Sequence, residues 1–161
     1  MRRITASIAL ALILGSALIA PAAAGEQRPF QGRFTGSGIA VAQRCGPAAL
    51  TLGFAIQGEM THLGRVTGGG TNCTELALGT SAVPIWDGLV TLVAADGSTL
   101  LTTYEGGQGA PSAGFATFAH DHVIIGGTGR FAGASGELSV RGLFDLANFT
   151  VSGAASGWIS Y

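Results

Sequence analysis

The stretch VIIGGTGRFAGASG, residues 123–136, decides the fold of this chain. Its apolar run and the spacing Gly127-x-Gly129-x-x-Ala132 match a dinucleotide-binding fingerprint. That fingerprint needs a helix directly after the glycines, whose N-terminus faces the pyrophosphate. Here Gly133-Ala134-Ser135-Gly136 follows instead, and two glycines in the first helical turns cost about 1 kcal/mol each relative to alanine. The stretch therefore predicts a turn between two β-strands.

In this reading the glycines supply the positive φ angles and close backbone approach that a tight, irregular turn needs. We expect Phe131 to plug the end or side of a barrel and Arg130 to face solvent or a carboxylate. The predicted structural turn consists of Gly126, Gly127, Gly129, Phe131, Gly133 and Gly136.

Alternation of apolar and polar residues predicts an all-β chain with almost no helix. Leu50, Leu52, Phe54 and Ile56, for example, share one face of a strand. Asp96-Gly97 lies between two β-prone runs and predicts a two-residue type I′ hairpin turn. The long connection over 71–87, which contains Cys73, is expected to be irregular. The eight predicted strands span 30–41, 49–59, 64–70, 88–95, 98–106, 113–125, 136–145 and 148–161.

Short connections imply antiparallel neighbours, and eight such strands suggest a closed barrel, which has no edge strands. We expect all eight phenylalanines to fill the interior, with Trp86 and Trp158 near the rims. The many glycines are consistent either with an open cavity or with sharp strand coiling.

The N-terminus is typical of a secretory signal peptide. Arg2 and Arg3 precede an apolar run over 8–20 and the small residues of 21–24. We expect a signal peptide over 1–24, a single barrel domain over 25–161, and an exported protein in the periplasm or outside the cell. No membrane span is expected after cleavage, and the few Trp and Tyr residues argue against an outer-membrane barrel.

Charge gives no reason to expect nucleic acid as a partner. Residues 25–161 contain six arginines, no lysine and nine acids, so the net charge is 6 − 9 = −3. Two cysteines in an exported chain predict a disulfide between Cys45 and Cys73, with two free thiols or half of a metal site as the alternatives. The absence of lysine is typical of a bacterial origin in our interpretation.

The three histidines are candidate zinc ligands. His120 and His122 are two apart on a predicted strand, so both imidazoles can point into the barrel, and His62 could join them. No fourth ligand has suitable spacing, so we expect no metal and no cofactor. The candidate catalytic residues are Glu105, Glu59 and His62, since a buried carboxyl with a raised pKa can act as a general acid or base. Glu137 lies at a strand end as well, and a solvated barrel rim is the alternative for all three carboxylates.

The segment 125–136, IGGTGRFAGASG, resembles a glycine motif of allene oxide cyclases and plant dirigent proteins. LLTTYEG (100–106) resembles a strand of the cyclases, while THLGR (61–65) and GWISY (157–161) resemble bacterial exported proteins of the same barrel type. The resemblance implies an eight-stranded antiparallel barrel with a central cavity. In the plant families that cavity guides the cyclisation of an unsaturated epoxide or steers radical coupling. It implies a homo-oligomer as well, and it transfers no catalytic residue to this chain.

Three functions compete on this basis. A non-catalytic module that binds a small apolar molecule predicts a dry cavity with few polar groups. A cyclase or isomerase predicts at least one buried ionisable side chain. A structural protein predicts a filled barrel.

Overall fold

The computed structural model describes residues 25–41, 45–46, 49–75 and 82–161. The predicted signal peptide lies outside these residues. The described part contains eight strands and one short 3-10 helix: β1 (Arg28–Ala40), β2 (Ala49–Met60), β3 (Gly64–Glu75), β4 (Val83–Val93), β5 (Thr99–Gln108), β6 (Phe115–Gly127), η1 (Gly129–Phe131), β7 (Ser135–Asp145) and β8 (Thr150–Ser160).

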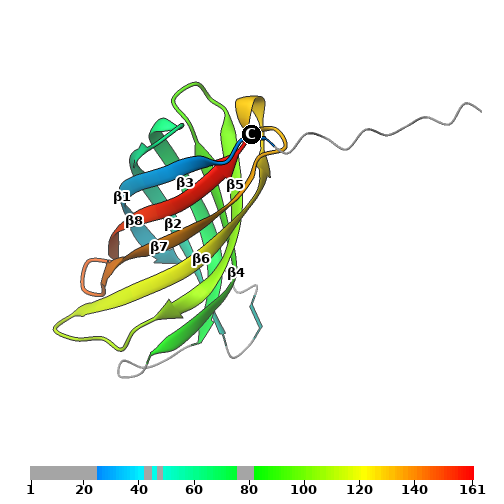
Figure 1. Cartoon of the computed structure of the whole chain (residues 1–161). Helices are drawn as coiled ribbons and strands as arrows, with labels where there is room; N and C mark the ends of the chain where they lie inside the picture. The colour runs from blue at the N-terminus through cyan, green and yellow to red at the C-terminus, as the bar shows by residue number, and fades with distance from the viewer. Residues whose placement is uncertain (1–24, 42–44, 47–48, 76–81) are drawn as a thin grey trace, which may run out of the picture.

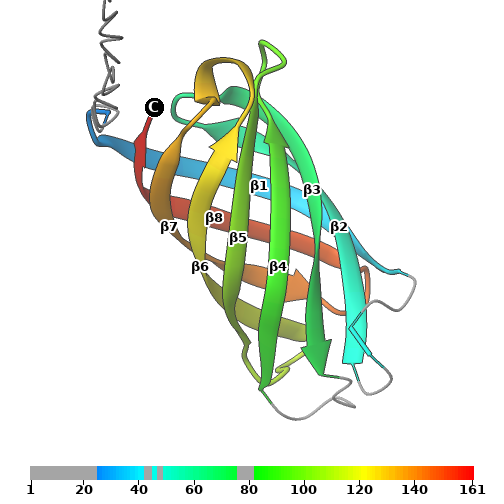
Figure 2. The same cartoon turned by 90° about the vertical axis from the view of Figure 1, so that its right-hand side faces the viewer.

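Each strand pairs antiparallel with the next along the chain, and β8 returns to pair with β1, so the sheet closes into a barrel (Figures 1 and 2). The β1–β8 seam runs from Arg28 opposite Ile159 to Ser37 opposite Thr150. The predicted all-β, eight-stranded antiparallel barrel is confirmed.

The glycine-rich stretch forms the connection between β6 and β7, as predicted. Gly129 has φ +60° and Gly133 has φ +76°, a region that side chains with a Cβ rarely adopt. Phe131 is fully buried and its ring lies 5.1 Å from that of Tyr161. Arg130 pairs with the Asp96 carboxylate at 3.2 Å. The stretch is therefore a structural turn that closes one end of the barrel.

The β4–β5 connection differs from the predicted type I′ turn. Gly97 has φ +83°, but Asp96 does not have a positive φ. Hydrogen bonds from Gly97 N to Ala94 O (3.0 Å) and from Ala94 N to Ser98 O (2.8 Å) define a three-residue loop. A three-residue hairpin loop usually consists of a type I turn followed by one residue in the left-handed region. Gly97 takes that position, so no other residue of this loop needs a positive φ.

The prediction of an irregular connection over 71–87 is wrong at both ends of this range, because strands extend into it from each side. β3 continues to Glu75, and β4 begins at Val83 and includes Pro84. Register shifts at Thr71/Cys73 and at Ile85/Gly88 mark bulges in β3 and β4. A bulge inserts extra residues and breaks the simple alternation, which hides a strand from periodicity analysis.

The predicted disulfide is present. Cys45 and Cys73 are joined with a Cα–Cα distance of 5.7 Å. Because Cys73 belongs to β3, the bond ties this strand to the connection between β1 and β2. It does not pin an irregular loop, contrary to the expectation.

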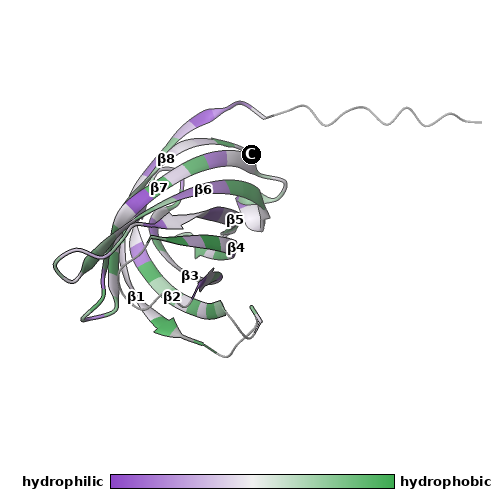
Figure 3. Ribbon diagram, turned by 90° about the horizontal axis from the view of Figure 1, so that it is seen from below, coloured by the Kyte–Doolittle hydropathy of each residue, from purple (hydrophilic) through white to green (hydrophobic). Residues whose placement is uncertain are grey.

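One end of the barrel is sealed. We call it the closed end; it carries the β2–β3, β4–β5 and β6–β7 connections. Side chains packed there are at most 1% exposed: Phe30, Leu63, Leu100, Phe131 and Ile159. Hydrophobic and hydrophilic residues alternate along the strands that lead away from this end (Figure 3).

Two of the eight phenylalanines do not fill the interior. Phe115 is 47% exposed and Phe149 is 49% exposed. Phe115 lies an odd number of positions from His122 on β6, so the pleat turns its side chain outward. Phe149 lies in the β7–β8 turn with φ +54°.

No helix within the described ranges is both long enough and apolar enough to cross a membrane.

Candidate functional site

The barrel interior contains a cavity of about 120 Å³. Most of its wall is apolar, with phenylalanines from β1, β2, β6 and β7 and aliphatic side chains from β2, β4, β7 and β8. An engineered cavity of about 150 Å³ in another protein stays dry and binds benzene, so this volume suits one ring-sized molecule. The aromatic and aliphatic lining residues are Phe30, Phe34, Leu52, Phe54, Ile56, Met60, Ile85, Val90, Leu92, Tyr104, Phe118, Leu138, Val140, Phe144, Val151 and Ala155.

The cavity opens away from the closed end. Its lining near Phe30 and Leu92 is fully buried, whereas Gln108, Phe144 and Val151 are partly exposed. These three residues lie at the strand ends beside the β5–β6 and β7–β8 connections. We call this end the mouth.

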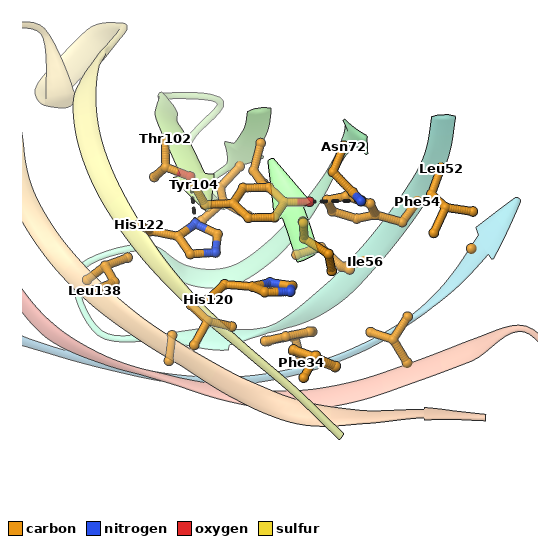
Figure 4. Close-up of a pocket in the computed structure, with 18 of the residues that line it drawn as sticks. Phe34, Leu52, Phe54, Ile56, Asn72, Thr102, Tyr104, His120, His122 and Leu138 are labelled. Carbon is orange, nitrogen blue, oxygen red and sulfur yellow. Dashed lines mark hydrogen bonds between the residues drawn. The ribbon is translucent and has the colours of Figure 1, made fainter. Parts of the chain in front are cut away.

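Tyr104 of β5 occupies the centre of one wall. Its hydroxyl donates to Asn72 Oδ1 at 3.1 Å, reaching across β4 to β3 (Figure 4). Gly88 is paired with Tyr104, and a Cβ there would collide with the tyrosine ring. The bulges in β3 and β4 lie beside both partners. The sheet irregularity thus makes room for the ring and brings Asn72 to its hydroxyl.

His120 and His122 lie on β6 and face the interior beside Tyr104 (Figure 4). The His122 ring stacks on Tyr104 with centroids 4.5 Å apart and planes 9° apart. The His120 ring stacks on Tyr104 and on Phe118, at 4.9 Å in each case. His122 Nδ1 lies 3.0 Å from Thr102 Oγ1. The predicted shared face is confirmed, and both rings are fixed by their neighbours.

The Nε2 atoms of both histidines are buried and have no hydrogen-bond partner among the described residues. Burial lowers the pKa of His122 from 6.5 to about 3, and the neighbouring His120 adds to this shift. Burial likewise lowers the pKa of His120 to about 4, although the Asp121 charge opposes it. Both imidazoles are therefore uncharged at neutral pH.

His62 lies away from this pair. It sits in the β2–β3 turn at the closed end with φ +67°. Its Nε2 is 2.9 Å from the Pro29 carbonyl oxygen, and its Nδ1 is 3.3 Å from the Tyr161 hydroxyl. The expectation that His62 could join His120 and His122 is wrong, because its strand-end turn holds it among other partners.

Glu59 on β2 and Glu105 on β5 are exposed, and neither lines the cavity. Glu137 on β7 is exposed as well. A catalytic role for Glu59, Glu105 or His62 stays a prediction, and it would have to act outside the cavity.

Across the described residues there is no group of three or more His, Cys, Asp or Glu side chains able to hold a metal ion.

Sequence reasoning missed Asn72 and Thr102, and it did not assign Tyr104 to the interior. Alternation over 100–104 places Leu100, Thr102 and Tyr104 on one face, which could have found two of them. Asn72 was assigned to an irregular connection, and only the pairing of β3 with its neighbours shows where it lies.

Comparisons with known proteins agree with this architecture. No protein-family model matches the chain, and no curated protein matches it. Among solved structures, a pterocarpan synthase dirigent protein matches with a TM-score of 0.50 and 16% sequence identity, over 86% of this chain and 97% of that chain. The two proteins share a fold. At this identity the likeness carries no information on activity.

Proposed function

We propose that this protein is an exported barrel that binds a small, mostly apolar molecule in its interior. The observation that carries the proposal is the apolar cavity of about 120 Å³, sealed at one end and open at the other. Concave, mostly apolar sites with a few polar groups are the usual form of small-molecule sites. The cavity argues against the alternative of a filled structural barrel.

The Cys45–Cys73 disulfide supports export, because such bonds persist in oxidising compartments. The shared fold supports a place near dirigent-type barrels. We propose that the chain belongs to a bacterial, exported branch of the allene oxide cyclase and dirigent group.

Toluene is a suitable first probe. Removing its seven carbons from water is worth roughly 0.8 kcal/mol each, which corresponds to a Kd of about 0.1 mM. We expect toluene to raise the Tm by several degrees at millimolar concentration and to shift NMR signals of the interior residues.

Two phenylalanine variants separate binding in the cavity from binding on the surface. Val151→Phe places a ring in the mouth and should abolish the toluene effect. Val123→Phe makes the same change at a side chain that is 51% exposed on β6, and it should leave binding intact. Equal toluene binding by both variants would contradict the proposal.

Native mass spectrometry of protein purified from its own host complements these probes. A reproducible small-molecule adduct would identify the natural ligand class.

A second candidate is a cyclase or isomerase. The uncharged imidazoles of His120 and His122, whose Nε2 atoms are buried, favour it, because a neutral imidazole can accept a proton from a bound substrate. An enzyme would release a changed molecule, so recovery of an unaltered ligand after prolonged incubation would support the binding module instead.

A further inference from the structure

The polar side chains of the cavity gather on one wall. Thr102 and Tyr104 come from β5, His120 and His122 come from β6, and Asn72 reaches this group from β3 (Figure 4). Gln108, at the mouth end of β5, extends the same wall. The opposite wall is formed by phenylalanines and aliphatic residues of β1, β2, β7 and β8. A ligand in this space meets a polar wall on one side and an apolar wall on the other.

Most polar atoms of this wall are already paired. The Tyr104 hydroxyl bonds Asn72, and Thr102 bonds His122 Nδ1. Two polar atoms of this wall are not paired: the Nε2 atoms of His120 and His122 are both buried and have no hydrogen-bond partner among the residues described. The His122 side chain is only 9% exposed. A buried polar atom without a partner is costly and rare in native structures, so it requires a physical reason.

The two rings cannot turn freely to find other partners. His122 is held by its stack on Tyr104 and by Thr102, and His120 lies between Tyr104 and Phe118. The two unpaired atoms therefore keep a fixed position beside the cavity. Preorganised groups of this kind favour a ligand that supplies the missing hydrogen bonds.

The wall also limits the charge of the ligand. No Asp, Glu, Lys or Arg is among the described residues that line the cavity. The two imidazoles are uncharged at neutral pH because burial lowers the pKa of each. An ionised ligand would lose its hydration without gaining a counter-charge, which is strongly unfavourable.

We propose that the cavity takes an uncharged, mostly apolar molecule that carries a hydroxyl or carbonyl group, and that this group hydrogen-bonds the Nε2 atoms of His120 and His122. This inference rests on the proposed function, since it names the class of ligand for the same cavity.

Three probes of the same size test it: ethylbenzene, benzyl alcohol and benzaldehyde. The first has no hydrogen-bonding group, the second donates and accepts, and the third only accepts. In a cavity without polar partners, benzyl alcohol should bind about 10–100-fold more weakly than ethylbenzene, because its hydroxyl loses its hydrogen bonds to water. We expect the wild-type protein to bind benzyl alcohol or benzaldehyde within about threefold of ethylbenzene, measured by NMR titration or calorimetry.

The variants assign the effect to the histidines. His120→Leu should weaken the oxygen-bearing probes by about tenfold and leave ethylbenzene unchanged. The double variant His122→Leu, Thr102→Val removes the second imidazole together with its partner, so no buried hydroxyl is left alone, and it should act in the same direction. Circular dichroism and an intact disulfide establish that each variant is folded.

The outcomes separate the two proposals. One outcome is that ethylbenzene binds, while benzyl alcohol and benzaldehyde both bind about 10–100-fold more weakly. This result would overturn the histidine inference but would still support binding of apolar molecules. An unchanged probe ratio in both folded variants would overturn it as well. If none of the three probes binds the wild-type protein, the proposed function itself fails.

Discussion

At the scale of single residues, His120 and His122 carry most of the chemical information in this molecule. Imidazoles with buried nitrogen atoms, as in this cavity wall, are favoured only in the unprotonated form. Their surroundings are set by Tyr104, whose ring covers both. Acid and steric changes at these positions should therefore report on the whole site.

Acid should destabilise the fold through these two histidines. Their pKa values of about 4 and about 3 lie below the unfolded value near 6.5, so the unfolded chain binds more protons below that pH. The free energy of unfolding should fall as the pH drops from about 6.5 to about 3, by several kcal/mol for the pair. Urea unfolding at several pH values measures this loss.

His120→Leu should reduce the acid loss, because it removes one of the two imidazoles whose pKa is lowered. Identical pH profiles for the wild-type and His120→Leu proteins would contradict the assignment.

Gly88→Ala tests the packing of Tyr104. The added Cβ collides with the tyrosine ring, so we expect a loss of about 1–3 kcal/mol in the free energy of unfolding. Gly107→Ala is the matched control on the partner strand β5, because its Cβ would meet only the Val83 carbonyl oxygen at 3.4 Å. Combining Gly88→Ala with Tyr104→Leu should cost less than the sum of the single changes, and strict additivity would argue against the contact.

At the scale of elements, the β6–β7 turn and the β4–β5 loop hold each other at the closed end. Arg130 N donates to Ser98 Oγ at 3.3 Å, and Thr99 N donates to Thr128 Oγ1 at 3.2 Å. The Asp96–Arg130 ion pair joins the same two connections, although it is exposed and contributes little. These contacts hold the turn that places the buried Phe131 side chain at the closed end.

Alanine substitutions at two glycines of this turn distinguish the cost of backbone strain from the cost of a steric collision. Gly129 and Gly133 both have positive φ, so alanine at either should cost about 1–2 kcal/mol. A Cβ at Gly129 would also collide with Ser98, whereas at Gly133 nothing lies within 4 Å. Gly129→Ala should therefore destabilise the protein more in urea unfolding than Gly133→Ala. A reversed order would show that the two connections are not packed together.

At the scale of the whole molecule, the disulfide adds a covalent cross-link to the closed barrel. The bond spans 28 residues and links β3 to the segment that joins β1 to β2. In the loop-entropy model such a cross-link contributes about 3–4 kcal/mol by restricting the unfolded chain.

Cys45→Ser, Cys73→Ser should lower the free energy of unfolding by about 3 kcal/mol and leave the barrel folded. The denatured wild-type mass should rise by about two units on reduction, as expected for one disulfide. A stability equal to that of the wild-type protein would contradict the loop-entropy account.

Sequence alone determined the strands with regular alternation, the glycine turn, the disulfide and the shared face of His120 and His122. These features depend on local periodicity, on positive φ angles or on chain composition, and each of these can be predicted from a short segment of sequence or from residue counts. The tertiary structure alone decided that β3 and β4 extend through bulges, that Asn72 meets the Tyr104 hydroxyl, and that His62 lies apart from the other histidines. Those features depend on which residues face each other across strands, and closing the β1–β8 seam fixes that register for the whole sheet.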